Sequence, residues 1–152
     1  MRYVLSKETF STVIESAPLV SIDLVFKNTQ RETLLGQRLN KPTKEYGFVP
    51  DGRILKNESL ANAFKRLTRE ELGQKFSIEQ ATLLEPYDHF YTDNIFDDSF
   101  STHYVAIAYI LEVEQTLFDL TIGEQYDGYQ WFDILKISSN NKIHKNTAVY
   151  FE

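Results

Sequence analysis

The sequence predicts one α+β domain in which helices form layers on a mixed β-sheet. Segments typical of strands outnumber helical ones and interleave with few helices, which is the pattern of an α+β or layered α/β/α domain. The chain has 152 residues, the length of one domain, and its hydrophobic content of 42% is ordinary for a globular protein. Since no repeat or linker divides it, we expect a single domain over residues 1–152.

The first half of the chain begins with a short helix and continues with strands. Ser6 is suited to cap the helix, because a serine side chain accepts hydrogen bonds from the first free N–H groups, and Pro18 ends it. The apolar run over 19–27 predicts a central strand. Two further strands are expected, at 34–38 and 46–49.

The second half begins with the strongest helical pattern in the sequence, over 59–72, which Gly73 is expected to end. Strands are then expected over 81–91 and 104–113, with an acidic, aromatic loop between them. The chain is expected to close with a strand, a short helix and a helical turn, at 130–132, 133–137 and 145–151.

The composition excludes several classes of function. With 16 Lys and Arg against 22 Asp and Glu, the net charge is −6, so a basic face for general nucleic-acid binding is not expected. The absence of cysteine excludes disulfides, thiolate metal sites and cysteine nucleophiles. No apolar run approaches the ~18 residues of a membrane span, and the N-terminus turns polar too soon for a signal peptide. We therefore expect a soluble, cytoplasmic protein whose partners are neither nucleic acids nor membranes.

One position breaks the apolar pattern of the 59–72 helix. At ~100° per residue, Leu60, Phe64 and Leu67 share one stripe, and Glu71 falls in the middle of it. An unpaired buried carboxylate is strongly unfavourable. Either the helix end is frayed or exposed there, or Glu71 has a cation or a salt bridge.

The residues around this helix stand at a distinctive spacing. Residues 52–73 read GRILKNESLANAFKRLTREELG, and they resemble the Nudix box, G-x5-E-x7-R-E-U-x-E-E-x-G-U, at Gly52, Glu58, Arg66, Glu70, Glu71 and Gly73. The resemblance implies a Nudix hydrolase, whose fold is an α/β/α sandwich around a mixed β-sheet. In this family the box forms a loop–helix–loop that holds Mg²⁺ against the diphosphate of a nucleoside diphosphate derivative, because a diphosphate and a carboxylate need a cation between them. Arg66 and Glu70, four residues apart, are expected to pair.

Three positions of the box depart from the pattern. Leu67 stands where a glutamate is usual, and Thr68 and Gln74 replace aliphatic residues. Ordinary pyrophosphate cleavage uses several box carboxylates, so the loss of one at Leu67 argues against it. The same departure marks the GDP-mannose mannosyl hydrolases. The resemblance to this branch covers nearly the whole chain, with matches at 17–21, 34–38, 46–50, 66–68, 89–91, 102–105, 124–125 and 129–131.

Membership of this branch implies a particular reaction. Water attacks C1 of the sugar with inversion and GDP leaves, so that a C–O bond breaks and one Mg²⁺ suffices to stabilise the leaving diphosphate. The implied substrate is GDP-mannose, with GDP-glucose as an alternative. The implied cofactor is Mg²⁺, with Mn²⁺ as an alternative, and the branch also implies a homodimer.

The resemblance assigns ligands for the metal and the diphosphate. The metal ligands are the backbone carbonyl of Asp51, the Glu71 side chain and Gln125. Arg38 and Arg53 match arginines that contact the diphosphate, a role that suits the paired donors of a guanidinium group.

The remaining assignments surround the sugar and the leaving group. His89 and Tyr104 match residues that help charge build up on departing GDP, and Asp23 matches a carboxylate beside the sugar. An N-terminal segment is implied to contact the substrate near guanine, across the dimer interface, through Val4, Leu5 and Phe10.

Plain structural alternatives exist for these assignments. Arg38 can equally be a surface strand residue, and Tyr104 a core residue. His89 can be an ordinary loop histidine, and Asp23 a buried, hydrogen-bonded strand residue. The three N-terminal residues are as readily core contacts as ligand contacts.

Two departures from the branch fall on the chemistry. The general base of the branch is a histidine directly after the metal-binding glutamine, and here that position is Tyr126. A phenol with a pKa near ~10 is a poor base at neutral pH, whereas an imidazole with a pKa near ~6.5 is a good one. Asp51 replaces a glycine, so its carboxylate adds negative charge near the diphosphate or becomes an extra metal ligand.

Three outcomes follow from these departures. In the first outcome, the enzyme hydrolyses a GDP-sugar slowly, and Asp127, Glu70 or Asp51 replaces the missing base. The rate then rises with pH. Alternatively, it acts on another nucleotide-sugar or breaks a P–O bond. In the third outcome it binds a nucleotide-sugar without catalysis.

Overall fold

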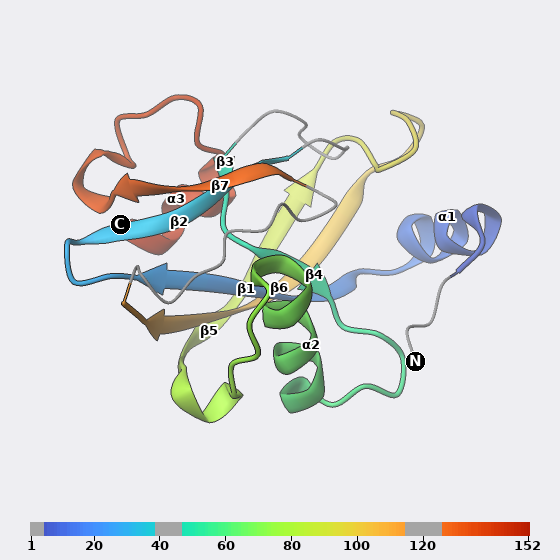
Figure 1. The fold of residues 1–152 in the computed structure, drawn as a ribbon. Coiled ribbons are helices and arrows are strands. Elements are labelled where there is room, and N and C mark those ends of the chain that lie inside the picture. Colours follow the sequence, from blue (N-terminus) through green and yellow to red (C-terminus); the bar gives the residue numbers. More distant parts are fainter. Residues whose placement is uncertain (1–4, 39–46, 115–125) are drawn as a thin grey trace.

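The computed structural model describes residues 5–38, 47–114 and 126–152, and for residues 37–38 and 126–128 it describes the backbone alone. Within these ranges the chain forms a seven-stranded mixed sheet with helices on both faces (Figure 1). This architecture confirms the expected α+β class and the layered arrangement around a mixed sheet.

The sheet has the strand order β3–β2–β1–β6–β5, with β4 paired to β1 and β7 paired to β2. Its strands are β1 (Leu19–Lys27), β2 (Glu32–Arg38), β3 (Gly47–Phe48), β4 (Asp51–Arg53), β5 (Thr82–Tyr91), β6 (Thr102–Glu112) and β7 (Tyr126–Asp133). β1 and β6 run parallel over the whole length of β1, and the other pairings described are antiparallel. Next to their turn β1 and β2 pair at Lys27 and Thr33, and further along β1 pairs with β4 instead.

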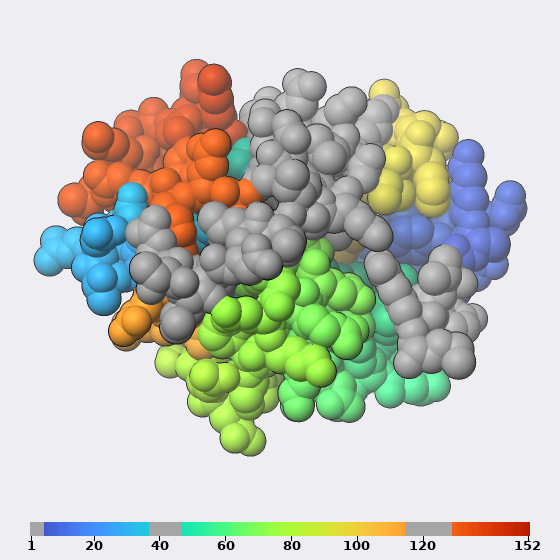
Figure 2. All heavy atoms as spheres, viewed as in Figure 1, coloured from blue at the N-terminus to red at the C-terminus, as the bar shows by residue number. Residues whose placement is uncertain are grey.

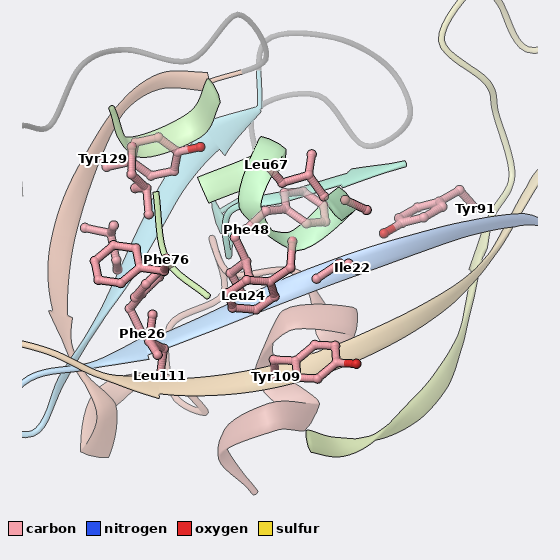
Figure 3. Packing of buried hydrophobic residues seen from close by; sticks show 14 residues of the cluster. Ile22, Leu24, Phe26, Phe48, Leu67, Phe76, Tyr91, Tyr109, Leu111 and Tyr129 are labelled. Carbon is pink, nitrogen blue, oxygen red and sulfur yellow. The ribbon is translucent and has the colours of Figure 1, made fainter. Parts of the chain in front are cut away.

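β1 is buried on both faces, as its continuous apolar run predicts. Ile22, Leu24 and Phe26 belong to a core beneath α2 (Leu60–Leu72), and Val25 belongs to a second core on the opposite face. Figure 3 shows the first core, in which Ile22 and Leu24 lie among side chains from α2, β6 and β7. Because side chains alternate along a strand, Asp23 belongs to the second face.

α2 begins and ends at the residues that the sequence indicates. The Ser59 side chain accepts a hydrogen bond from the N–H of Asn62 at 3.1 Å, which caps the first turn. Gly73 ends the helix with a φ of 77°, a left-handed conformation that glycine adopts without steric cost. The expected helix over 59–72 is therefore confirmed, with Ser59 as its cap.

The two ends of the chain lie against different parts of the sheet. α1 (Lys7–Ser16) is capped by Ser6 as expected, and it lies beside the loop at 93–101 (Figure 2). The segment after α2 contains the short η1 (Ile78–Gln80). The chain closes with η3 (Ile134–Lys136), α3 (Lys145–Ala148) and η4 (Val149–Phe151), and residues of the last two pack in the second core.

Two strands differ from the sequence-based expectation. β4 was not expected, since Asp and Gly are depleted in strands, and its strand conformation comes from pairing with β1. β7 begins at Tyr126, four residues before the expected strand, and the expected helix over 133–137 is a single 3₁₀ turn.

No helix in the described part of the chain is long and apolar enough to cross a membrane.

Candidate functional site

One arginine holds the helix of the box in place. Arg66 donates through Nε and Nη2 to the two carboxylate oxygens of Glu58, at 2.7 and 2.9 Å, and through Nη1 to Glu70 at 3.1 Å. Its Nη2 also donates to the backbone carbonyl of Arg53 at 2.9 Å. The hydrogen bond from Arg66 lowers the pKa of Glu58 and raises the pKa of Arg66 itself. The expected Arg66–Glu70 pair is confirmed, and the arginine also ties α2 to β4 and to the loop before the helix.

The box glycine is required by close packing against α2. A Cβ atom on Gly52 would lie 2.1 Å from Cδ2 of Leu67, whose side chain is 2% exposed. Leu67, at the position where the Nudix pattern has a glutamate, therefore fills the space beneath β4 with hydrocarbon. Thr68 is also structural, because its hydroxyl accepts a hydrogen bond from the N–H of Phe76 at 3.0 Å and so ties the segment after the helix to α2.

Glu71 is buried at the end of α2. The helix continues to Leu72, and Glu71 is 6% exposed, so the expected alternative of a frayed or exposed helix end is wrong. Its Oε2 accepts a hydrogen bond of 2.7 Å from the hydroxyl of Tyr129 on β7. A carboxylate in this position requires donors or a cation to offset the loss of water. Tyr129 supplies one such donor, which the sequence did not indicate.

A second carboxylate site lies where β1 and β4 pair. Asp23 and Asp51 are register partners across these antiparallel strands, so their side chains leave the sheet on the same face. Like charges directly opposite each other are unfavourable unless positive charge or a proton is close by. Arg53 follows Asp51 by two residues on β4 and shares this face. Its guanidinium lies 4.9 Å from the centre of the Phe10 ring.

Asp23 also belongs to a buried network with a tyrosine and a histidine. The hydroxyl of Tyr150, on η4, donates to Oδ2 of Asp23 at 2.5 Å, and the hydroxyl oxygen of Tyr150 also lies 3.3 Å from Nε2 of His89. All three residues are at most 7% exposed. Burial and the negative charge of Asp23 raise the pKa of Tyr150 far above its ordinary value, so the phenol stays protonated. No sequence signal pointed to Tyr150, which is 127 positions from Asp23.

The other predicted residues that the structure describes lie around these groups. Tyr104 is the register partner of His89 across β5 and β6, and its ring packs edge-on against Tyr91 with centroids 6.5 Å apart. Phe10 of α1 is half-buried between the Arg53 guanidinium and the ring of Phe96. Leu5 is half-buried just before α1.

Four predicted site residues lie wholly or partly outside the residues that the structure describes. Val4 and Gln125 lie outside the described residues, as do the side chains of Arg38 and Tyr126. The backbones of Arg38 and Tyr126 are register partners across β2 and β7. The arginine predicted to bind diphosphate and the position predicted for the general base therefore stand directly opposite each other.

The described site residues form two groups on opposite faces of the sheet. Glu71 and its partner Tyr129 lie on the face covered by α2, while Asp23, His89 and Tyr150 lie on the face covered by the C-terminal helices. β4 joins the two groups. Leu67 packs against Gly52 of this strand from one side, and Asp51 stands next to Asp23 on the other.

The donor chemistry of this region fits a hard divalent cation. The Glu71 carboxylate and the oxygens of Asp51 are oxygen donors, which Mg²⁺ prefers, and Gln125, the third predicted ligand, lies outside the described residues. Among the described residues, no three His, Asp or Glu side chains converge as a metal site. A metal ion here would therefore need a backbone carbonyl or a residue outside the described ranges as a further ligand.

A hollow of about 410 Å³ lies elsewhere on the molecule. It is lined by the turn between β1 and β2, the end of β6, and η3. None of the predicted site residues lines it. The described residues that the sequence predicts for the site therefore lie outside this hollow.

The mixed sheet and the arginine-linked helix after β4 define a Nudix hydrolase fold. The NUDIX domain family matches residues 17–151, and the chain belongs to this family. Hydrolases of this family generally use divalent metal ions such as Mg²⁺ or Mn²⁺.

The chain resembles individual proteins in sequence and in fold. The low-salt glycan biosynthesis protein Agl8 of Haloferax volcanii is 37% identical over 102 residues, which cover 67% of this chain and 64% of that protein, so the match spans less than two thirds of the relative's length. The MutT protein from Methanosarcina mazei Go1 has a TM-score of 0.71 at 18% identity, over 90% of this chain and 92% of that one. The NUDIX domain of Shewanella oneidensis NrtR, solved in complex with ADP ribose, has a TM-score of 0.67 at 16% identity, over 97% and 95% of the two chains.

Proposed function

We propose that this protein hydrolyses a GDP-sugar, GDP-mannose or GDP-glucose, to GDP and the free sugar by attack of water at C1 of the sugar. The observation that carries the proposal is Leu67, which puts buried hydrocarbon against Gly52 where a box glutamate is usual. Cleavage at phosphorus uses several box carboxylates, often with more than one metal ion. Because Leu67 replaces one of them, α2 offers too few carboxylates for that reaction. The relative named for glycan biosynthesis supports a nucleotide-sugar as the substrate class.

The diphosphate would be bound by arginines and by one metal ion. In the proposal, Arg53 and Arg38 donate to the diphosphate oxygens. The contact between Arg53 and the Phe10 ring supports this role, because a guanidinium stacked on an aromatic face loses less freedom when it binds. Glu71, Asp51 and Gln125 would hold Mg²⁺ or Mn²⁺. When bound, such an ion stabilises the negative charge that builds up on the departing diphosphate.

The sugar and the leaving oxygen would be handled on the face that carries Asp23. An ionised Asp23 beside the sugar favours the positive charge that develops at C1 in the transition state. His89 and Tyr104 would donate hydrogen bonds to the leaving group. A bond forms between the water oxygen and C1, the bond between C1 and the phosphate oxygen breaks, and its electron pair leaves with GDP. The proton from water passes to a base, with inversion at C1.

The general base is the group of this reaction for which the chain departs most from the family branch. Tyr126 at the base position is protonated at neutral pH unless its environment is strongly perturbed. Asp127, Glu70 and Asp51 are the carboxylates proposed to replace it. Glu70 is the least suited of them, because its carboxylate already accepts a hydrogen bond from Arg66. We therefore expect slow turnover that rises between pH 6 and 10, and a faster enzyme after Tyr126→His. A fast, pH-independent rate, or no gain from that substitution, would contradict this assignment.

The substrate is tested with a panel of nucleotide-sugars. The full chain is incubated with GDP-, UDP-, ADP- and dTDP-sugars and Mg²⁺, and every product is identified. The proposal expects GDP and free sugar from a GDP-sugar. In ¹⁸O-water the label should enter the sugar, and label in a phosphate product would show P–O cleavage instead.

A second candidate is a protein that binds a nucleotide-sugar without hydrolysing it. Tyr126 favours this alternative, since no histidine occupies the base position. The NUDIX domain of NrtR bound to ADP ribose is an example of a structural relative that holds a nucleotide-sugar. Calorimetry would then detect binding of GDP-mannose with Mg²⁺, while no GDP is released.

We also propose that residues 1–152 form a single domain and that the protein acts as a homodimer. Light scattering on the purified chain tests the oligomeric state. A mass close to twice 17.7 kDa is the expected result.

A further inference from the structure

A tyrosine of β7 reaches the buried carboxylate at the end of α2. The hydroxyl of Tyr129 donates to Oε2 of Glu71 at 2.7 Å, although the two residues are 58 positions apart in the sequence. Each residue is 6% exposed, so bulk water has little access to this hydrogen bond. Figure 3 shows Tyr129 among the side chains of the core beneath α2. The contact ties the carboxylate to the sheet as well as to its own helix.

The hydrogen bond restrains the direction of the carboxylate. The last side-chain torsion of a glutamate has no sharply preferred value, so the carboxylate can turn about this bond unless its partners prevent it. An ionised carboxylate only accepts hydrogen bonds, whereas a phenol has one proton to donate. Oε2 of Glu71 is therefore kept toward the Tyr129 hydroxyl. The helix sets the position of Glu71, and the tyrosine restrains how its two oxygens are turned.

The position of Tyr129 is itself set by the sheet and the core. Tyr129 is the register partner of Gly36 across β7 and β2, and it belongs to the core that contains the buried apolar side chains of α2. It also follows Gln125, the third predicted metal ligand, by four residues along the chain. β7 begins at Tyr126, directly after that glutamine. The strand that brings the hydroxyl to Glu71 thus also continues from a predicted ligand.

We propose that Tyr129 is a positioning residue, which holds the Glu71 carboxylate in the orientation that binds Mg²⁺ or Mn²⁺. This inference rests on the proposed function, in which Glu71 is a metal ligand. Carboxylates that bind metals are in turn oriented by hydrogen bonds, and the loss of such a partner typically lowers metal affinity 10- to 100-fold. Tyr129 acts through Glu71 and need not touch the ion or the substrate.

The first test measures Mn²⁺ binding to the full chain by electron paramagnetic resonance, which detects the free ion. Tyr129→Phe is expected to bind Mn²⁺ 10- to 100-fold more weakly than the wild-type protein. Glu71→Gln should also bind it more weakly, because the ion loses a charged ligand. Unchanged or tighter binding by a folded Tyr129→Phe protein overturns the proposal, since a purely structural hydrogen bond would affect stability alone. Unchanged binding by Glu71→Gln overturns it as well.

The matched control is Tyr109→Phe, which removes a hydroxyl from another tyrosine of the same core. Tyr109 is 7% exposed, and its ring meets that of Phe64 on α2 edge-on, with centroids 5.5 Å apart. Figure 3 shows Tyr109 and Tyr129 at separate places in this core. Tyr109→Phe should keep the wild-type affinity for Mn²⁺. An equal loss of affinity in Tyr109→Phe would overturn the proposal, because the loss would then follow from any change in the core.

A second measurement uses the wild-type protein and does not depend on the folding of a variant. The ¹³Cζ NMR signal of Tyr129 should shift when Mg²⁺ is added, because an ion on Glu71 changes the charge of the group that accepts the hydrogen bond. The signal of Tyr109 should stay in place. No shift of the Tyr129 signal at saturating Mg²⁺ overturns the proposal.

The role of Tyr129 and the proposed function can fail separately in these experiments. If the wild-type protein binds Mn²⁺ but releases no GDP from GDP-mannose, the proposed hydrolysis is wrong, and the Mn²⁺ affinities alone decide the role of Tyr129. If both the wild-type protein and Tyr129→Phe release GDP with the same kcat and the same Mn²⁺ affinity, hydrolysis stands and the role of Tyr129 is overturned. A wild-type protein that binds no Mn²⁺ overturns both.

Discussion

Glu71 and Asp23 are two buried carboxylates that each accept a tyrosine hydroxyl, but they lie on opposite faces of the sheet. Glu71 stands near the end of α2, two residues before Gly73, and its partner Tyr129 comes from β7. Asp23 stands in the middle of β1, between β4 and β6, and its partner Tyr150 comes from the last turn of the chain. Both are almost as buried as the apolar residues beside them.

The difference between them lies in the elements that hold them. Asp23 is part of a network from three separate elements, and the strands on either side of β1 prevent it from shifting alone. Glu71 depends on one helix, whose position depends in turn on Arg66 and on the contact between Leu67 and Gly52. We infer that the Asp23 side is set by the fold of the whole chain, whereas the Glu71 side is set locally by the box. Substitutions on each side of the sheet distinguish these two dependences.

The largest effect is expected from Glu71→Gln. The amide oxygen still accepts the hydrogen bond from Tyr129, so the unfolding free energy should change little. The charge that would face the metal ion is lost, and kcat for GDP release should fall by about 10³-fold, in the range found when one strong electrostatic contact to a transition state is removed. Steady-state rates at increasing Mg²⁺ measure this effect.

The matched control is Glu79→Gln, which removes an exposed carboxylate from η1. It should leave both the rate and the Mg²⁺ dependence unchanged. A Glu71→Gln protein with a near wild-type rate would show that this side of the sheet takes no part in catalysis, and the comparison with Asp23 would lose its functional meaning.

Arg66→Ala should give the next largest effect, on stability. It leaves Glu58 and Glu70 without their shared cation and frees the carbonyl of Arg53, so the unfolding free energy should fall by about 3 kcal/mol, as for other broken, partly buried ion pairs. Urea denaturation measures this change. Arg69→Ala, at an exposed position of the same helix, should cost less than about 0.5 kcal/mol. Equal losses in the two variants would mean that Arg66 does not hold α2 in place.

Much of the fold could be predicted because its signals are local. The helix cap at Ser6, the start of α2 near Ser59, the stop at Gly73 and the apolar run of β1 each depend on a few neighbouring residues, and the structure has all four. β4 could not be predicted in this way. Two of its three residues, Asp51 and Gly52, disfavour a strand, and β4 forms through pairing with β1.

The same distinction between local signals and long-range contacts applies to the residues of the candidate site. The pair of Arg66 with Glu70 follows from helical spacing, and the same spacing predicts that Glu71 lies in the apolar stripe of α2, where it is buried. Tyr129 and Tyr150 could not be found, because their contacts join residues 58 and 127 positions apart. The pairing of Asp23 with Asp51 depends on the register of a strand that the sequence did not indicate.

Gly52→Ala tests whether β4 joins the two faces through its contact with α2. The added Cβ would meet Cδ2 of Leu67 in a packed core, and overpacking of this kind costs about 2 kcal/mol. Leu67→Ala opens a cavity and should cost about 3 kcal/mol alone. In the double variant the two changes compensate, so its loss should be smaller than the sum by more than about 1 kcal/mol. If the two losses of unfolding free energy simply add in urea denaturation, the packing of Leu67 does not depend on the absence of a side chain at Gly52.

The smallest effect is a pH dependence of stability that comes from Glu58, on the box side. The hydrogen bond from Arg66 lowers the pKa of Glu58 in the folded state, so at acidic pH the unfolded chain binds more protons at this residue. Its contribution is therefore fully present above the unfolded pKa of about 4.3 and is lost as pH falls through the folded pKa. Wild-type protein should exceed Glu58→Gln in unfolding free energy by about 1 to 2 kcal/mol at pH 7, and the gap should close toward pH 3. Glu15→Gln, at an exposed position of α1, should show no such closing gap, and a gap for Glu58→Gln that is constant from pH 7 to pH 3 would contradict the ionic role of this pair.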